Sequence, residues 1–334
     1  MKVIKSMSVE ELRELVSGNN SYTRTTFDPR DENARFFIDD DGKMKFVIGS
    51  NDARSLTQDA YVKLGQMVGI PGAYTEKTPN IMMVPHMNYW LVNRGLAQIT
   101  ACSKEGTVEL FSKGSVIPVR DDLIVDVVEE VFGKDLRVAH VSQDACRSSY
   151  SIVSAETTEP VRVGDMVQSG VSILNSYSRQ FPTTIAAYIH VLSCTNGAVS
   201  TDNVFKMSMH GGSEEEYIDW LKVAVQDAKD SIEEEVQRLQ NMANTSISSH
   251  LSDNLESFFI EFGVPMSIRE EIRSKVIDGR VTSLYDLYSI VTDVASNSED
   301  VLENPVLSHR LMQVGGSMSA HPQFCEMCHR ALLN

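Results

Sequence analysis

Residues 163–198, VGDMVQSGVSILNSYSRQFPTTIAAYIHVLSCTNGA, contain two apolar strands and the polar turns that bound them. A Gly-Asp pair opens a strand that ends near residue 174, and the Asn-Ser-Tyr-Ser run after it hydrogen-bonds its own backbone. The run Thr183–Cys194 is too rich in β-branched and aromatic residues to be an exposed strand, and the following Asn-Gly favours a hairpin turn. We therefore predict buried strands of one sheet.

Four polar residues lie at the ends of these strands or shortly after them. Asn175 and Ser176 end the first strand, Asn196 follows the second, and His210 lies in the run MSMHGG. Together they would form a polar pocket of hydrogen-bond donors and acceptors. No carboxylate-plus-base pair at catalytic spacing accompanies them, so a β core without a site is favoured over an enzyme built on this pocket.

The order of these motifs resembles a known family. Gly-Asp, a strand ending in Asn-Ser and a strand ending in Cys-Thr-Asn-Gly-Ala are similar to the phage/plasmid-like proteins, a domain of unknown function found in bacteriophages and plasmids. The resemblance includes LTQDAYVKLGQMVGIPGAY upstream and His210 downstream, and it covers roughly residues 50–240. Tyr-Ser-Arg-Gln stands where many relatives have a glycine-containing turn. The family has no agreed activity, so the resemblance implies a mobile-element origin and the host cytoplasm.

Composition is typical of a globular protein, with 42% apolar and 23% charged residues among 334. No run of about twenty apolar residues is present. The start MKVIKSMSVEELRELV indicates an amphipathic helix with a Ser8–Glu11 capping box, not a signal peptide. Five scattered cysteines favour reduced thiols over a disulfide framework. We expect a cytoplasmic protein outside the membrane.

The chain divides into three predicted parts. Residues 1–33 hold a helix at 9–16 and a polar, turn-rich arm at 17–31. Residues 34–245 form an α+β core domain, and residues 246–334 form a helical C-terminal region with a terminal Cys/His segment. The predicted helices of that region lie at 251–262, 267–277 and 283–295.

The core domain is predicted to be a mostly antiparallel sheet packed on long helices that collect on one side. Its elements are a hairpin at 34–48 around Asp-Gly, helices at 56–67 and 121–132, a hairpin around Glu105-Gly106, strands at 136–140, 150–155, 161–171 and 183–194, and a segment at 87–93 that fits helix or strand equally. Regular βαβ alternation is missing, which argues against a doubly wound nucleotide-binding fold.

The helix predicted over residues 213–244 is acidic and amphipathic. Its carboxylates outnumber its basic residues and supply much of the formal charge of −16. Its apolar residues recur at steps of three and four: Tyr217, Leu221, Ala224, Ala228, Ile232, Val236 and Leu239. Such a stripe buries against the sheet or another subunit, and a homo-oligomer is expected. The acidic face is a solvated surface or, alternatively, a mimic of nucleic acid that docks a basic host protein.

The C-terminal segment offers ligand types that suit zinc: His321, Cys325, Cys328 and His329. Adjacent Cys328 and His329 seldom bind one metal, and a second ligand pair would have to come from His309 or another subunit. Cys-X-X-Cys-His also matches haem attachment, which needs an exported protein. A metal-free reduced pair is therefore favoured over zinc, and no other cofactor is expected.

Arginine beside tyrosine predicts a surface for single-stranded DNA, because bases stack on rings while guanidinium groups hold phosphate. The predicted contacts are Arg24, Arg35, Arg162, Arg179, Tyr22 and Tyr177. Scattered surface charge is the alternative explanation, and the net negative charge allows only a local site.

An antiparallel sheet backed by long helices, without a cofactor motif, is similar in outline to the Rad-fifty-two-like annealing proteins of mobile elements. We expect a phage or plasmid DNA-metabolism accessory protein that binds single-stranded DNA as an oligomeric annealing or recombination protein. The alternatives are a module that binds a host protein and an enzyme of unknown reaction.

Overall fold

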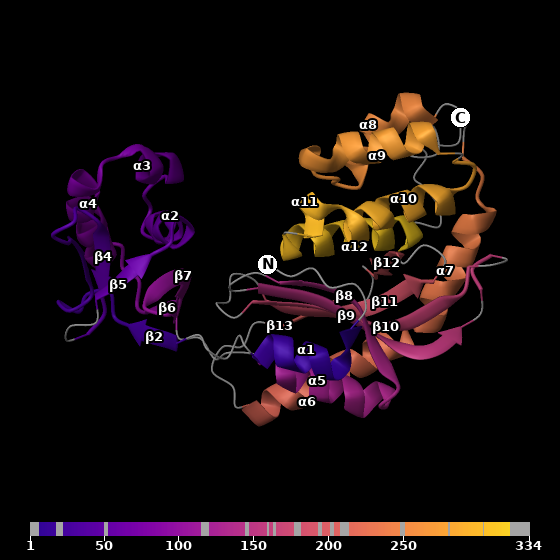
Figure 1. The fold of residues 1–334 in the computed structure, drawn as a ribbon, viewed down its shortest axis with the longest axis horizontal. Helices are drawn as coiled ribbons and strands as arrows, with labels where there is room; N and C mark the ends of the chain where they lie inside the picture. Colours follow the sequence, from indigo (N-terminus) through magenta and orange to yellow (C-terminus); the bar gives the residue numbers. More distant parts are fainter. Residues whose placement is uncertain are drawn as a thin grey trace.

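A computed structural model of the protein describes residues 7–17, 23–49, 53–114, 120–143, 147–158, 160–162, 165–176, 182–192, 196–200, 204–207, 214–247, 251–279, 281–302 and 304–320. These residues form two sheets with separate hydrophobic cores. One core is built within residues 27–111, and the others combine residues 7–16 with residues 124–318. We call residues 23–113 the small lobe, and residues 7–17 together with 120–320 the large lobe (Figure 1).

The small lobe is a six-stranded sheet, sheet B, covered on one face by three helices. Its strand order is β2 (Thr23–Phe27), β6 (Ile99–Lys104), β7 (Thr107–Lys113), β5 (Ala53–Leu56), β4 (Met44–Val47) and β3 (Arg35–Ile38). Its helices are α2 (Gln58–Met67), α3 (Gly72–Lys77) and α4 (Asn80–Asn93). Phe46 lies in this core, with its ring centroid 4.7 Å from that of Phe36 and 5.4 Å from that of Phe27.

The large lobe contains a seven-stranded sheet, sheet A, in which all pairs are antiparallel. Its order is β1 (Met7–Ser8), β8 (Leu136–Gln143), β9 (Arg147–Thr158), β10 (Val167–Ser176), β11 (Thr183–Val191) and β12 (Asn196–Val199), with β13 (Phe205–Met207) also paired to β11. The two strands of the opening sequence, β10 and β11, are central and pair with each other, as predicted.

Helices cover both faces of sheet A (Figure 1). One face packs against α1 (Val9–Ser17), α5 (Asp121–Phe132) and α6 (Glu214–Asp230), and the other against α7 (Ile232–Asn244), α10 (Leu284–Asn297) and α12 (Pro305–Ala320). Helices α8 (Leu251–Glu261) and α9 (Met266–Asp278) lie beyond α10, on its side away from the sheet (Figure 1), and α11 (Glu299–Leu302) connects α10 with α12. The α+β class is confirmed, but the prediction that helices collect on one side is wrong. Every residue of β10 and β11 is buried, so both faces of these strands need a cover.

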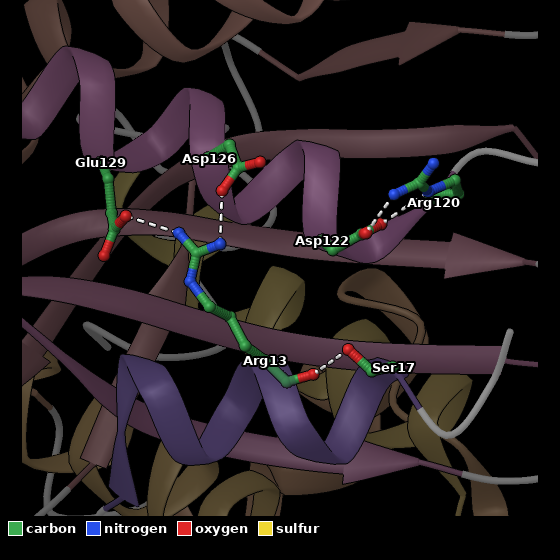
Figure 2. Close-up of polar contacts among 6 residues, drawn as sticks. All are labelled: Arg13, Ser17, Arg120, Asp122, Asp126 and Glu129. Atoms are coloured by element: carbon green, nitrogen blue, oxygen red, sulfur yellow. Dashed lines mark hydrogen bonds and ion pairs between the residues drawn. The ribbon is translucent and has the colours of Figure 1, made fainter.

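The first helix is fastened to the large lobe. Leu12 and Val16 of α1 belong to the same hydrophobic cluster as the apolar side of α5. Arg13 forms ion pairs with Asp126 and with Glu129 on α5, the second at 2.5 Å (Figure 2). Because β1 also pairs with β8, residues 7–17 are an integral part of this lobe.

Several predicted elements differ in the structure, and the strand predicted at 161–171 is β10 at Val167–Ser176. The polar arm at 17–31 contains a strand, β2, because its Thr-rich backbone pairs with β6 along five residues. The long helix predicted at 213–244 is divided at Ser231, whose hydroxyl donates to the carbonyl of Ala228 at 2.9 Å and so competes with the helical hydrogen bonds.

Candidate nucleic-acid interface

Two of the predicted arginines share one face of sheet B. In β2, Phe27 points into the core, so Arg24 lies on the opposite face because side chains alternate along a strand. In β3, Phe36 points into the core, and Arg35 is likewise on the opposite face. The described helices lie on the core side, so both arginines lie on the opposite face, where Cys102 of β6 and Leu110 of β7 are buried as a separate pair.

The same face carries two lysines and a phenylalanine. Lys45 of β4 is paired with Phe37 of β3, so both lie on the face opposite the core. In β6, Ser103 faces the core, where it accepts a hydrogen bond from the buried Arg54. The next residue, Lys104, therefore lies on the same face as Lys45. Lys45 donates to Ser55 at 2.7 Å and lies 3.8 Å from the carboxylate of Asp39. We call the five side chains Arg24, Arg35, Phe37, Lys45 and Lys104 the basic sheet face. Its outermost strands are five strand spacings apart, roughly 24 Å.

The small lobe is electrically distinct from the rest of the chain. Residues 23–113 contain eleven arginines and lysines and eleven aspartates and glutamates, so their formal charges sum to zero. The remaining residues therefore carry the whole formal charge of −16. A polyanion is repelled least by this lobe.

Arg162 lies in the large lobe and serves a different purpose. Its guanidinium donates to Asp165 at 2.7 Å and to Asp286 at 2.8 Å, and it lies over the ring of Tyr285. Burial raises the pKa of the Asp286 carboxyl, but bonds from Arg162 and from the N–H groups of Thr282 and Ser283 outweigh it, so the pKa is below its usual range. Phosphate would have to displace two carboxylates, so Arg162 is not included in the basic sheet face. The other predicted contacts, Tyr22, Tyr177 and Arg179, lie outside the described residues.

Asn175 of the predicted polar pocket belongs to a buried hydrogen-bond centre at the start of α5. Asp121 accepts hydrogen bonds from Ser148 at 2.9 Å, Tyr150 at 3.1 Å and Asn175 at 2.9 Å. Thr183 donates to the Asn175 side-chain oxygen, which also accepts from the backbone N–H of Ser176. A carboxylate with this many donors is a structural anchor that joins α5 to β9 and β10, and through Asn175 to Thr183 of β11.

The remaining pocket residues do not join this centre. Asn196 pairs with Val191 at the far end of β11, whereas Asn175 lies next to Thr183 at its start. Eight residues of strand, roughly 27 Å, separate the two ends. His210 lies outside the described residues. The structure therefore places Asn175 and Ser176 together and Asn196 elsewhere.

The predicted apolar stripe is used inside the chain. Its first four members, from Tyr217 to Ala228, pack with the strands of sheet A. Val236 and Leu239 join the core on the other face. The apolar stripe was predicted to bury against the sheet or against another subunit, and in the structure it packs against sheet A of the same chain.

Sequence patterns did not indicate a buried histidine pair between sheet A and α12. His140 of β8 lies 3.1 Å from the hydroxyl of Ser308, and the neighbouring His309 makes no side-chain hydrogen bond to another described residue. Burial, with the nearby His190, lowers the pKa of His140 to about 4. Burial, with His140 and Lys206, lowers the pKa of His309 to about 3. Both rings are therefore neutral at pH 7.

The four predicted zinc ligands lie in residues 321–334, outside the described residues. Within the described ranges, no group of three or more His, Cys, Asp or Glu side chains is placed to hold a metal ion. No described helix is long and apolar enough to cross a membrane.

Comparisons with protein-family models, curated proteins and solved structures gave no match to this chain.

Proposed function

We propose that the protein binds single-stranded DNA through the basic sheet face, as an accessory protein in phage or plasmid DNA metabolism. The observation that carries the proposal is that Arg24 and Arg35 share the sheet face opposite the helices with Lys45, Lys104 and Phe37. A sheet with cations around an aromatic ring suits the backbone and bases of an unpaired strand. The charge-balanced lobe supports the same choice of site.

The test measures fluorescence anisotropy of a labelled oligodeoxythymidine over a range of salt concentrations. The double variant R35A/K45A removes two cations from the basic sheet face. If each holds one phosphate, the variant binds more weakly and its log–log salt slope falls by about 1.4, since each contact to a single strand contributes about 0.7.

The matched control is K63A, which removes an exposed lysine from α2 on the helical side of the same lobe. It should keep the affinity and salt slope of the wild type. Absence of wild-type binding at low salt would contradict the proposal, and so would a double variant with unchanged affinity and slope.

A further inference from the structure

The outward half of α4 is apolar and exposed. Ile81 is 73% exposed, Met82 54%, Tyr89 59%, Trp90 42% and Val92 46%. At 100° per residue these positions, with Pro85, His86 and Asn93, fill one half of the helix, and Met83, Met87 and Leu91 fill the buried half. We call the exposed half, together with Tyr74 of α3, the α4 face.

The inner side of α4 holds this face in a fixed position. Met83, Met87 and Leu91 are each at most 1% exposed in the small-lobe core. Asn88 accepts from the Phe36 N–H at 2.8 Å and donates to the Phe36 carbonyl at 2.9 Å, so the helix is bonded to the edge strand β3. The helix is therefore ordered before any partner arrives.

Tyr74 extends the α4 face onto α3. Its ring stacks on His86 with centroids 5.9 Å apart, and its hydroxyl lies 3.0 Å from Nδ1 of His86. Two helices thus contribute to one continuous surface.

The α4 face contains no carboxylate, lysine or arginine, since none occurs in residues 80–93. Protein interfaces are enriched in aromatic residues and Met and depleted of Lys, Glu and Asp at their centre, which is the composition of this helix. A single-stranded nucleic acid needs cations among the aromatic rings, and these are missing here.

We propose that the α4 face binds the same face of a second copy of this chain. In a two-fold dimer each copy presents the same patch, so an uncharged surface meets an uncharged surface and no complementary charge is required. The formal charge of −16 keeps two copies apart everywhere except near the small lobe, whose charges sum to zero. A charged partner protein would leave its charges unpaired against this face.

The size of the face is consistent with a dimer. Six large side chains with these exposures present roughly 700 Å² per copy, near the 800 Å² per partner of a standard interface. The α4 face and the basic sheet face lie on opposite sides of sheet B, so a dimer through the α4 face does not cover either basic sheet face. The inference is thus independent of DNA binding.

The test is sedimentation equilibrium of the full chain over a concentration series, at low and high salt. The wild type should dimerise, with a dissociation constant that does not rise with salt because the contact is apolar. M82K places like charges across the two-fold axis, and W90A removes the largest side chain of the α4 face. We expect W90A to raise the dissociation constant by about 30-fold, or about 2 kcal/mol, and M82K to do the same or more.

The matched control is V223K, which makes the same kind of change at a 58% exposed position on α6 of the large lobe. It should dimerise like the wild type. A second readout uses the W220F variant, in which Trp90 is the single remaining tryptophan and should show a concentration-dependent blue shift.

A monomeric wild type throughout the concentration series overturns the proposal, as does dimerisation of M82K and W90A with wild-type affinity. If the wild type is monomeric and W90A weakens DNA binding, the α4 face is a base-stacking surface instead. Failure of R35A/K45A to affect DNA binding leaves the dimer proposal intact, because the two tests use different variants and different measurements.

Discussion

At the scale of single residues, two buried polar side chains lie where helices pack on the strands of sheet A: Asp121 at the start of α5 and His309 in α12. Asp121 is anchored by three side-chain donors, whereas His309 has no side-chain partner among the described residues. A buried carboxylate with three donors adds stability, and a buried imidazole without a partner tolerates only its neutral form.

We predict that the protein loses stability as the pH falls below about 6.5. The pKa of His140 is about 4 in the folded chain and 6.5 in the unfolded chain, so the unfolded chain binds more protons between these values. The stability is complete above pH 6.5 and declines as the pH falls towards 4, by about 3 kcal/mol for His140 alone. Urea unfolding at a series of pH values measures this loss.

The variant H140Q removes one of the two titrating rings and should flatten the dependence of unfolding free energy on pH. The matched control is H86Q, at an exposed histidine of the small lobe, which should keep the wild-type slope. A wild-type stability that is constant between pH 7 and pH 5 would contradict the prediction.

At the scale of elements, α12 lies against β12 with a glycine at the contact. A Cβ added to Gly316 would lie 1.9 Å from the carbonyl oxygen of Val199 and 3.2 Å from the Cα of Ser200. Both neighbours are backbone atoms, so neither can rotate away. The absence of a side chain lets helix and strand approach this closely.

We predict that G316A destabilises the protein by about 2 kcal/mol or more, although alanine is favoured over glycine in a helix by about 1 kcal/mol. The helix must move away from β12 to admit the methyl group. The shift in urea midpoint measures the effect. Q313A, at a partly exposed position of the same helix, should change stability by less than about 0.5 kcal/mol, and an equally small effect of G316A would contradict the proposed contact.

The sequence predicts elements well where an amphipathic period or a turn pair is present. The helix at 121–132 has the bounds of α5, and the Asp-Gly pair places the β3–β4 hairpin correctly. Helix α4 was undecided because its exposed half is as apolar as its buried half, which removes the polar contrast that marks a surface helix. The break at Ser231 gave no sequence signal, because serine is tolerated within helices.

The candidate site could be predicted only in part. In the sequence, Arg24 and Arg35 are marked only by their aromatic neighbours. In the structure they share a face because Phe27 of β2 and Phe36 of β3 both point into the core, which directs both arginines to the opposite side of the sheet. Lys45, Lys104 and Phe37 were missed because strand register, which decides their face, comes from pairing between strands that are distant in sequence. The prediction that Asn175 and Asn196 lie together required both residues to be at the same end of β11. Turn residues in the sequence do not specify the end at which each one lies.

At the scale of the whole molecule, the two lobes have separate cores. The small lobe contains Trp90 and the large lobe contains Trp220, which are the two tryptophans of the chain. We predict that F46A, at the centre of the small-lobe core, lowers the stability of that lobe by about 3–5 kcal/mol and leaves the other unchanged. Urea unfolding should report a lower midpoint in a W220F background, where Trp90 is the fluorophore.

The control is the same substitution in a W90F background, where Trp220 reports on the large lobe and should keep its midpoint. The reciprocal change, I152A in sheet A, should affect only the Trp220 signal. Equal shifts of both signals would show that the lobes unfold as one cooperative unit.

The pairing of β1 with β8 sets an order of events during translation. Met7 lies opposite Val138, and 138 − 7 gives 131 positions between partners. At about 5–20 residues per second, the ribosome needs roughly 7 to 26 s to deliver the partner strand. The entire small lobe is synthesised within that interval, while the apolar residues Leu12 and Val16 are still without the α5 residues that bury them. The N-terminal segment therefore joins its fold only after the small lobe has been synthesised.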